Sequence, residues 1–364
     1  MCAPALLILQ LAAPAMAQMA DGELVIMAVD SSRLPEPDGT SRQVAPRPVG
    51  EGIDEVAREL NRRGGLLGRR LRVTHENDQC EADEAAAIAA RAVAQRVSAV
   101  IGHACSSAAI KAAAIYAEAG LVMIATGPRN PRLTAPAGRR GILRLAGRDD
   151  RQADSIAALV AAQFPGARMA IVHDRSLQGR GMAEEIRRGA VAAQVLPVLV
   201  TSYTSGIKDH AVIVGELKSA EVSLVVLPSQ PFEASMILDQ AQRAGGRVTA
   251  AIGTDVLAAD TPPARLLAAV KDFLVMLPWP GTGAEAQDAS KEGIERRLAA
   301  AALEIWGGAV EDARSAAADA VLVALRANAR ASRVGPVRFD DKGDAVVPSF
   351  QPHVWRDGRW QAWR

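Results

Sequence analysis

Short apolar runs alternate with helical segments along most of the chain, and this rhythm constrains the fold more than any other feature. The first run, residues 24–29, ends at Asp30 and is typical of a strand buried in a parallel sheet. We expect further strands at residues 71–74, 98–101, 121–125, 169–172, 195–200, 224–227 and 248–252. This alternation predicts an α/β protein with parallel sheets covered by helices on both faces, in which ligands bind beyond the carboxyl ends of the strands.

Apolar residues recur at helical spacing between these runs. Ile53, Val56 and Leu60 predict a helix that ends before Gly64-Gly65. We expect further helices at residues 82–96, 107–118, 180–193, 209–219, 232–244 and 309–329.

Two local signals and the length complete the prediction of the fold. Pro197 places the strand at 195–200 on a sheet edge, because proline has no backbone N–H group to donate to a neighbouring strand. Asp357-Gly358, flanked by tryptophans, predicts a β-hairpin. A chain of 364 residues is long for one core, so we expect two domains.

Residues 1–17 have the pattern of an export signal. The apolar segment 6–11 is followed by Ala15-Met16-Ala17, a cleavage site of small residues. No later segment approaches about 18 apolar residues, the length that spans a bilayer. We therefore expect an exported, soluble protein from which the signal peptide has been removed.

The charge is nearly balanced, with 42 lysines and arginines against 41 acidic residues. A net charge of +1 provides no field that attracts nucleic acid or an anionic membrane, and no basic stripe carries interleaved aromatic residues. We expect a small-molecule ligand and no nucleic-acid partner.

Two of the three cysteines would remain after cleavage, Cys80 and Cys105. An even pair in an oxidising compartment favours a disulfide, which would stabilise the fold by roughly 3 kcal/mol. The alternative is a metal site that adds His75 and His103, although the spacing matches no common zinc motif.

Polar residues at predicted strand ends are candidates for a binding site. Ser106 and Ser107 follow a strand and begin a helix, so they either cap the helix or hold a carboxylate with its free amides. Asp255 follows strand 248–252 and either receives an ammonium group or caps a turn.

Other candidates for catalysis are weak. Asp149-Asp150 is more typical of a helix N-terminus than of an acid/base pair. Residues 178–181 faintly resemble a dinucleotide loop, but Glu184 stands where the third glycine is needed. Walker loops, His-Glu-x-x-His and Gly-x-Ser-x-Gly are absent, so we expect neither an enzyme nor a cofactor.

Ordered tracts along most of the mature chain resemble the solute-binding proteins of branched-chain amino acid ABC transporters, the leucine/isoleucine/valine-binding family. The matching tracts are residues 61–69, 77–80, 102–107, 115–120, 130–134, 147–152, 170–174, 206–209 and 335–344.

The resemblance implies a two-lobed type I periplasmic binding fold, each lobe a mainly parallel sheet flanked by helices. Lobe 1 would comprise residues 22–147 and 279–348, and lobe 2 residues 148–278 and 349–364. The resemblance also implies a monomer that delivers an amino acid or a related small organic acid to a membrane permease. In the family, the serine after the second cysteine binds the ligand carboxylate and a late acidic residue binds its ammonium; here these positions are Ser106 and Asp255.

The chain departs from the family at the ligand pocket. Pro128-Arg129 replaces an Ala-Thr pair before Asn-Pro, and Gln178 and Gln230 replace tyrosines. We therefore expect a ligand that is more polar than a branched aliphatic amino acid, or of a different shape. Arg129 either pairs with an extra ligand carboxylate or points to solvent.

Two other functions fit the sequence. A ligand-sensing subunit without a transporter would share all of these features. An exported metal protein or enzyme would use His75, Cys80, His103 and Cys105 as ligands.

Overall fold

The structure, a computed structural model, describes residues 22–32, 47–136, 139–258, 261–278, 291–346 and 350–363, without the side chains of residues 177, 178 and 291. The predicted signal peptide, residues 1–17, lies outside the described residues. Within them, no helix is both long enough and apolar enough to cross a membrane.

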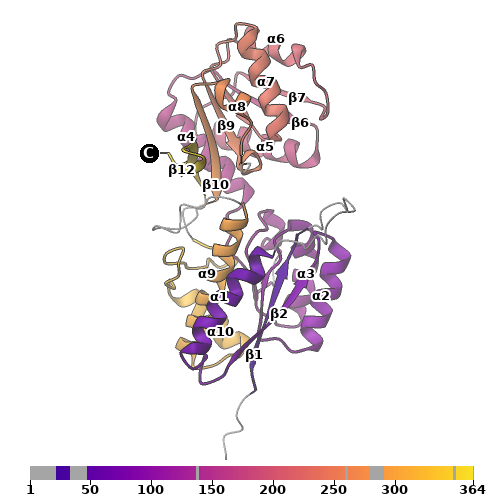
Figure 1. Ribbon diagram of the computed structural model, residues 1–364, viewed down its shortest axis with the longest axis vertical. Coiled ribbons are helices and arrows are strands. Elements are labelled where there is room, and N and C mark those ends of the chain that lie inside the picture. Colours follow the sequence, from indigo (N-terminus) through magenta and orange to yellow (C-terminus); the bar gives the residue numbers. More distant parts are fainter. Residues whose placement is uncertain are drawn as a thin grey trace, which may run out of the picture.

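Lobe 1 is a five-stranded parallel sheet with the helices that pack on it (Figure 1). The strand order is β2-β1-β3-β4-β5. The strands are β1 (Leu24–Asp30), β2 (Leu71–Asn77), β3 (Ala99–Gly102), β4 (Met123–Ala125) and β5 (Ile142–Arg144). The helices are α1 (Pro48–Arg62), α2 (Ala82–Ala94), α3 (Ser106–Glu118), α9 (Lys291–Ala313) and α10 (Ala318–Ala327).

Lobe 2 is a seven-stranded sheet in the order β12-β11-β10-β9-β8-β6-β7, parallel except for β11 and β12. The strands are β6 (Met169–Asp174), β7 (Leu199–Tyr203), β8 (Leu224–Leu227), β9 (Ala250–Thr254), β10 (Asp272–Pro278), β11 (Phe350–Arg356) and β12 (Arg359–Ala362). The helices are α4 (Asp149–Gln163), α5 (Leu177–Ala192), α6 (Ala211–Ser219), α7 (Pro231–Arg243) and α8 (Ala264–Ala268).

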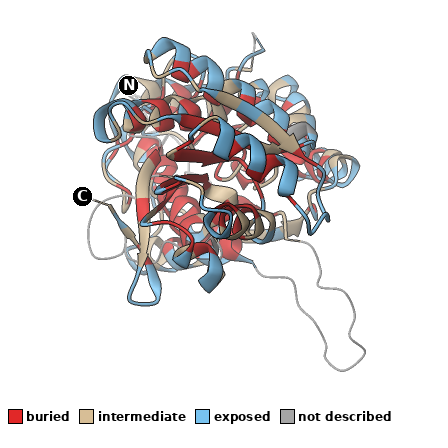
Figure 2. Ribbon diagram, turned by 90° about the horizontal axis from the view of Figure 1, so that it is seen from above, coloured by how far each residue is buried: buried red, intermediate tan, exposed pale blue. Residues whose placement is uncertain are grey.

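The central strands of both sheets are buried on both faces, as the continuous apolar runs predict. In β1, Ile26 and Ala28 face the core under α1 and α9, whereas Met27 and Val29 face the core under α2 and α3. In β6, Ala170 and Ile171 likewise belong to different cores. Figure 2 shows buried sheets between helices whose outer faces are exposed. The two-sheet α/β fold and its parallel strands are confirmed.

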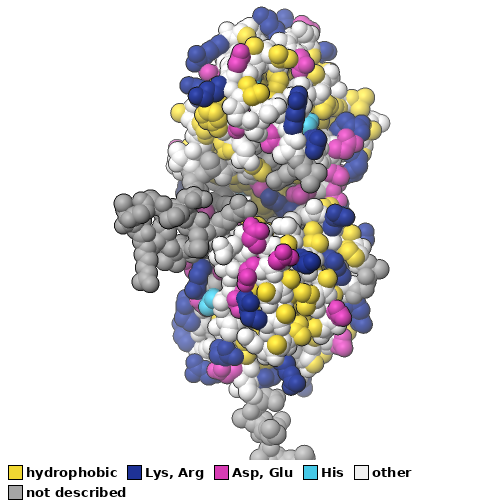
Figure 3. All heavy atoms as spheres, turned by 90° about the vertical axis from the view of Figure 1, so that its right-hand side faces the viewer, with side chains coloured by type: hydrophobic (Ala, Val, Ile, Leu, Met, Phe, Trp, Pro, Cys, Tyr) yellow, Lys and Arg dark blue, Asp and Glu magenta, His cyan; other side chains and the backbone are white. Residues whose placement is uncertain are grey.

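The chain passes between the lobes at three places: after β5, after β10 and before β11. In the space-filling view the lobes are two rounded bodies joined at a waist (Figure 3). Because strands of both sheets end near this waist, the loops that follow β3, β4 and β9 come together there.

Two predicted elements differ markedly in extent from the structure. The helix expected at 309–329 is two helices, because Arg314 adopts φ 49° and ends α9, and α10 begins at Ala318. The strand expected at 195–200 is β7, Leu199–Tyr203, which begins after Pro197; its position at a sheet edge is confirmed.

The C-terminal hairpin is confirmed. Trp355 pairs with Trp360 across β11 and β12, and their rings meet edge to face with centroids 5.4 Å apart. Asp357 and Gly358 both have positive φ, as a tight hairpin turn requires.

Gly52 generates a prediction, because it lets α1 pack closely on α9. A Cβ atom added there would lie 2.2 Å from the carbonyl oxygen of Arg296. We expect Gly52→Ala to lower the free energy of unfolding by about 1–3 kcal/mol in urea titrations, since the helices must move apart.

The matched control is Gly215→Ala on the exposed face of α6, where a Cβ meets nothing within 4 Å. It should raise stability by about 0.5–1 kcal/mol, because alanine is the better helix former. Equal effects of the two substitutions would contradict close packing of α1 on α9.

Candidate functional site

Three of the predicted ligand residues are linked by contacts that run from one lobe to the other. Ser106, the first residue of α3, accepts hydrogen bonds on Oγ from the backbone N–H groups of Arg129 (3.2 Å) and Asn130 (3.3 Å). Arg129 follows β4 and donates from Nη2 to Oδ2 of Asp255, which follows β9. The chain of contacts therefore runs from lobe 1 to lobe 2.

Arg129 does not extend into solvent, so that alternative is wrong. Its side chain is 21% exposed, and its Nε atom lies 3.5 Å from Oδ1 of Asp149 in the first turn of α4. Burial alone would lower the pKa of Arg129, but Asp255 and Asp149 outweigh burial and raise it. Burial raises the pKa of the Asp149 carboxyl, and Arg129 opposes that shift. Arg129 thus remains a cation between two acids.

Asp255 has a partner on each oxygen. Oδ2 accepts from Arg129, and Oδ1 accepts from Nε2 of Gln152 at 2.9 Å. Gln152 is fully buried on α4 and also donates to the carbonyl oxygen of Met276 at 2.8 Å. The position of Asp255 is therefore set by both lobes.

The Ser106 hydroxyl can still make one hydrogen bond. A serine hydroxyl has one donor and two acceptor lone pairs, and two backbone N–H groups occupy the lone pairs here. What remains is a single O–H donor, which suits a carboxylate or carbonyl oxygen of a ligand.

The other predicted ligand residues are not brought into this chain of contacts. Ser107 is exposed and its Oγ donates to the carbonyl oxygen of Cys80 at 3.4 Å. Pro128 is buried beside Arg129, and Gln230 is exposed at the N-cap of α7. Gln178 lies in α5, but its side chain is outside the described part of the structure.

Cys80 and Cys105 are joined by a disulfide, with Cα atoms 5.3 Å apart. The alternative metal site is therefore wrong, because both cysteine sulfurs are in the disulfide. His103 is fully buried and its Nδ1 lies 2.5 Å from Oδ2 of Asp78, while His75 lies 3.2 Å from Asp54. Neither histidine is positioned with the sulfurs as a ligand set in the described residues.

Ser31 is a residue that sequence reasoning missed. It follows β1, and its Oγ accepts from the backbone N–H groups of Ala104 (2.9 Å) and Cys105 (3.3 Å) and donates to Asp78 (3.1 Å). Ser31 therefore fixes the loop that leads into Ser106. The only sequence signal was its place after a strand.

A buried charge network occupies the first passage between the lobes. Arg144, at the end of β5, is fully buried and donates from Nε and Nη2 to Oδ1 of Asp344, at 2.8 and 2.6 Å. Arg148, the N-cap of α4, donates to Oδ2 of Asp344 at 2.9 Å and bidentately to Asp150. Asp149 and Asp150 thus lie in the first turn of α4, as expected, but the N-cap is Arg148.

The network changes the acidity of its members. Burial alone would raise the pKa of Asp344, but Arg144, Arg148 and Thr134 outweigh it and lower the pKa below its usual value. Arg148 lowers the pKa of Asp150 in the same way, against the effect of burial. Both carboxylates therefore stay charged at neutral pH.

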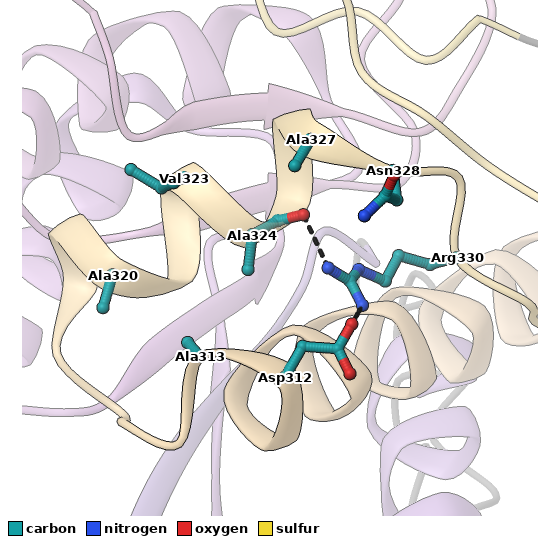
Figure 4. Close-up of a pocket in the computed structure, with 8 residues that line it drawn as sticks. All are labelled: Asp312, Ala313, Ala320, Val323, Ala324, Ala327, Asn328 and Arg330. Carbon is teal, nitrogen blue, oxygen red and sulfur yellow. Dashed lines mark hydrogen bonds and ion pairs between the residues drawn. The ribbon is translucent and has the colours of Figure 1, made fainter.

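A cavity of about 450 Å³ lies elsewhere, on the outer side of lobe 1 (Figure 4). It is lined by Asp312, Ala313, Ala320, Val323, Ala324, Ala327, Asn328 and Arg330, from α9, α10 and the segment that follows. Arg330 donates to Asp312 and to the carbonyl oxygen of Ala324. The cavity contains none of the predicted ligand residues and has no unpaired charge of its own to orient a ligand.

The sequence is similar to known binding proteins over most of its length. Residues 41–348 match the model of a family described as periplasmic binding protein. The leucine-specific-binding protein of Salmonella typhimurium is 29% identical over 314 residues, which cover 84% of this chain and 85% of that protein.

Solved structures have the same fold. The ABC transporter substrate-binding protein of Desulfitobacterium hafniense in complex with Leu superposes with a TM-score of 0.74 at 21% identity, over 94% of this chain and all of that one. A solute-binding protein from Rhodopseudomonas palustris in complex with 3,4-dihydroxybenzoic acid has a TM-score of 0.68 at 14% identity, over 93% of this chain and 95% of that one.

The buried network generates a prediction about stability. We expect Asp344→Asn to lower the free energy of unfolding by about 3 kcal/mol at pH 7, because Arg144 would be left buried without a counter-charge. Since the folded pKa of Asp344 is depressed, its contribution is present above about pH 4 and is lost as pH falls through the folded value. The difference from wild type should therefore shrink at pH 3.

Urea unfolding followed by circular dichroism at pH 7 and pH 3 measures both effects. Asp341→Asn, at an exposed neighbouring carboxylate, is the control and should change stability by less than about 0.5 kcal/mol. If the two variants unfold at the same urea concentration at pH 7, the network does not stabilise the passage between lobes.

Proposed function

Because this chain belongs to the periplasmic binding protein family, we propose that it captures an amino acid or a related small organic acid between its lobes and presents it to the permease of an ABC transporter. We take residues 22–147 and 279–348 as lobe 1, and residues 148–278 and 349–364 as lobe 2. Export directed by residues 1–17 would bring a monomer to the periplasm.

The observation that carries this proposal is the chain of contacts from Ser106 through Arg129 to Asp255. A ligand that touches these residues contacts both lobes at once. Such a ligand binds the closed arrangement better than an open one, and this difference drives closure. No covalent step is required.

The remaining predicted residues surround this centre in the proposal. The Ser106 hydroxyl and the adjacent amides of α3, including that of Ser107, would hold a carboxylate. Pro128, Gln178 and Gln230 would shape the space for the rest of the ligand, in place of an aromatic wall.

Relatives of this chain support a small carboxylic acid as the ligand. The Salmonella relative is named for leucine, and the structural neighbours hold Leu and 3,4-dihydroxybenzoic acid. The fold therefore accommodates acids with and without an ammonium group.

Thermal denaturation of the mature protein tests the proposal. We expect at least one member of a panel of amino acids, small carboxylates and amides to raise the melting temperature, because a ligand at one hundred times its dissociation constant adds about 2.7 kcal/mol of stability. Ser106→Ala should weaken that ligand about tenfold to hundredfold, through loss of a hydrogen bond to a charged group.

Ser219→Ala, at an exposed position at the end of α6, should leave the affinity unchanged. A panel in which no compound shifts the melting temperature, or a ligand that binds equally to the Ser106→Ala variant, would refute the proposed site.

A further inference from the structure

Asp255 already has a cation of its own. The guanidinium of Arg129 donates to Oδ2, and the amide of Gln152 donates to Oδ1. The Asp255 side chain is only 17% exposed, so water does little to weaken the pair. The second acid, Asp149, lies beside Nε of the same guanidinium. An ammonium group that binds to Asp255 or to Asp149 would therefore lie next to the positively charged guanidinium of Arg129.

Ser106 and Arg129 both retain unused hydrogen-bond donors at this centre, whereas the acceptors of Asp255 and Asp149 already face the Arg129 guanidinium. Ser106 retains its O–H group, as both of its lone pairs are occupied. A guanidinium has five N–H groups, of which one is donated to Asp255 and one faces Asp149. These donors fit the two oxygens of a carboxylate and have nothing to offer an ammonium group.

We propose that Arg129 is a specificity-determining residue, which occupies the acidic subsite as its resident counterion and selects small carboxylates that lack an α-ammonium group. This inference rests on the proposed solute-binding function and names its ligand class. A 2-oxo or 2-hydroxy acid leaves the pair of Arg129 and Asp255 intact. An amino acid has to displace Arg129 or place a second cation beside it.

Threonine has no charge and is too short to span the distance to Asp255, so Arg129→Thr removes the resident cation and is the informative substitution. It should release Asp255 to accept an ammonium group and reverse the preference. Arg132→Thr, at an exposed arginine three residues away, is the matched control and should retain the wild-type preference.

Three matched pairs of probes differ only in the group on the α-carbon: L-leucine and 4-methyl-2-oxopentanoate, L-phenylalanine and phenylpyruvate, and L-glutamate and 2-oxoglutarate. Isothermal titration of the wild-type protein should give a dissociation constant at least tenfold lower for the oxo acid in the pair that binds. In the Arg129→Thr variant the amino acid of that pair should bind more tightly. Adding Asp255→Asn to that variant should abolish the gain.

The outcomes separate this inference from the function on which it rests. If an amino acid binds wild type as tightly as its oxo acid, or if Arg129→Thr leaves the preference unchanged, the inference is overturned and solute binding stands. If neither wild type nor Arg129→Thr binds any of the six probes while circular dichroism shows both folded, the inference is overturned and so is binding of these acids by the proposed site.

Discussion

One carboxylate, Asp344, holds together the point at which the chain first passes from lobe 1 to lobe 2. Arg144 is fully buried, and a buried guanidinium without a counter-charge is strongly destabilising. Asp344 supplies that charge and also binds Arg148, the N-cap of α4. The end of β5, the start of α4 and the segment after α10 are thereby fixed to one another.

The proposed ligand-binding centre depends on this network through one further bond. Arg144 donates from Nη1 to the carbonyl oxygen of Asn130 at 2.7 Å, so it positions the loop that carries Arg129. Ser106 binds the same loop from the other side through the backbone N–H groups of Arg129 and Asn130. Arg129 reaches lobe 2 from a loop held on both sides, which explains how a long side chain can keep one position between two acids.

Local pattern predicted most of the fold, because buried parallel strands are continuous apolar runs and helices repeat their apolar residues every three to four positions. It failed where the signal is not local. Arg314 ends α9 in a left-handed conformation that usually requires glycine, so the sequence pattern predicts one continuous helix across this alanine-rich segment.

The same local reasoning placed Ser106 and Asp255, two residues of the candidate site, at strand ends. The partner of Arg129 was not found, because Asp255 lies 126 positions away. Arg144 and Asp344 are 200 positions apart, and no spacing rule connects them.

The C-terminal hairpin has a consequence for the order in which the protein forms. Strand β10 is almost entirely apolar and buried, and β11 covers its outer edge with residues made more than seventy positions later. Until β11 leaves the ribosome, β10 would present an open apolar edge of the kind that recruits strands from other chains. Lobe 1 also needs α9 and α10 for one face of its sheet. Each lobe therefore waits for segments that are made well after the rest of it, lobe 1 for α9 and α10 and lobe 2 for β11 and β12.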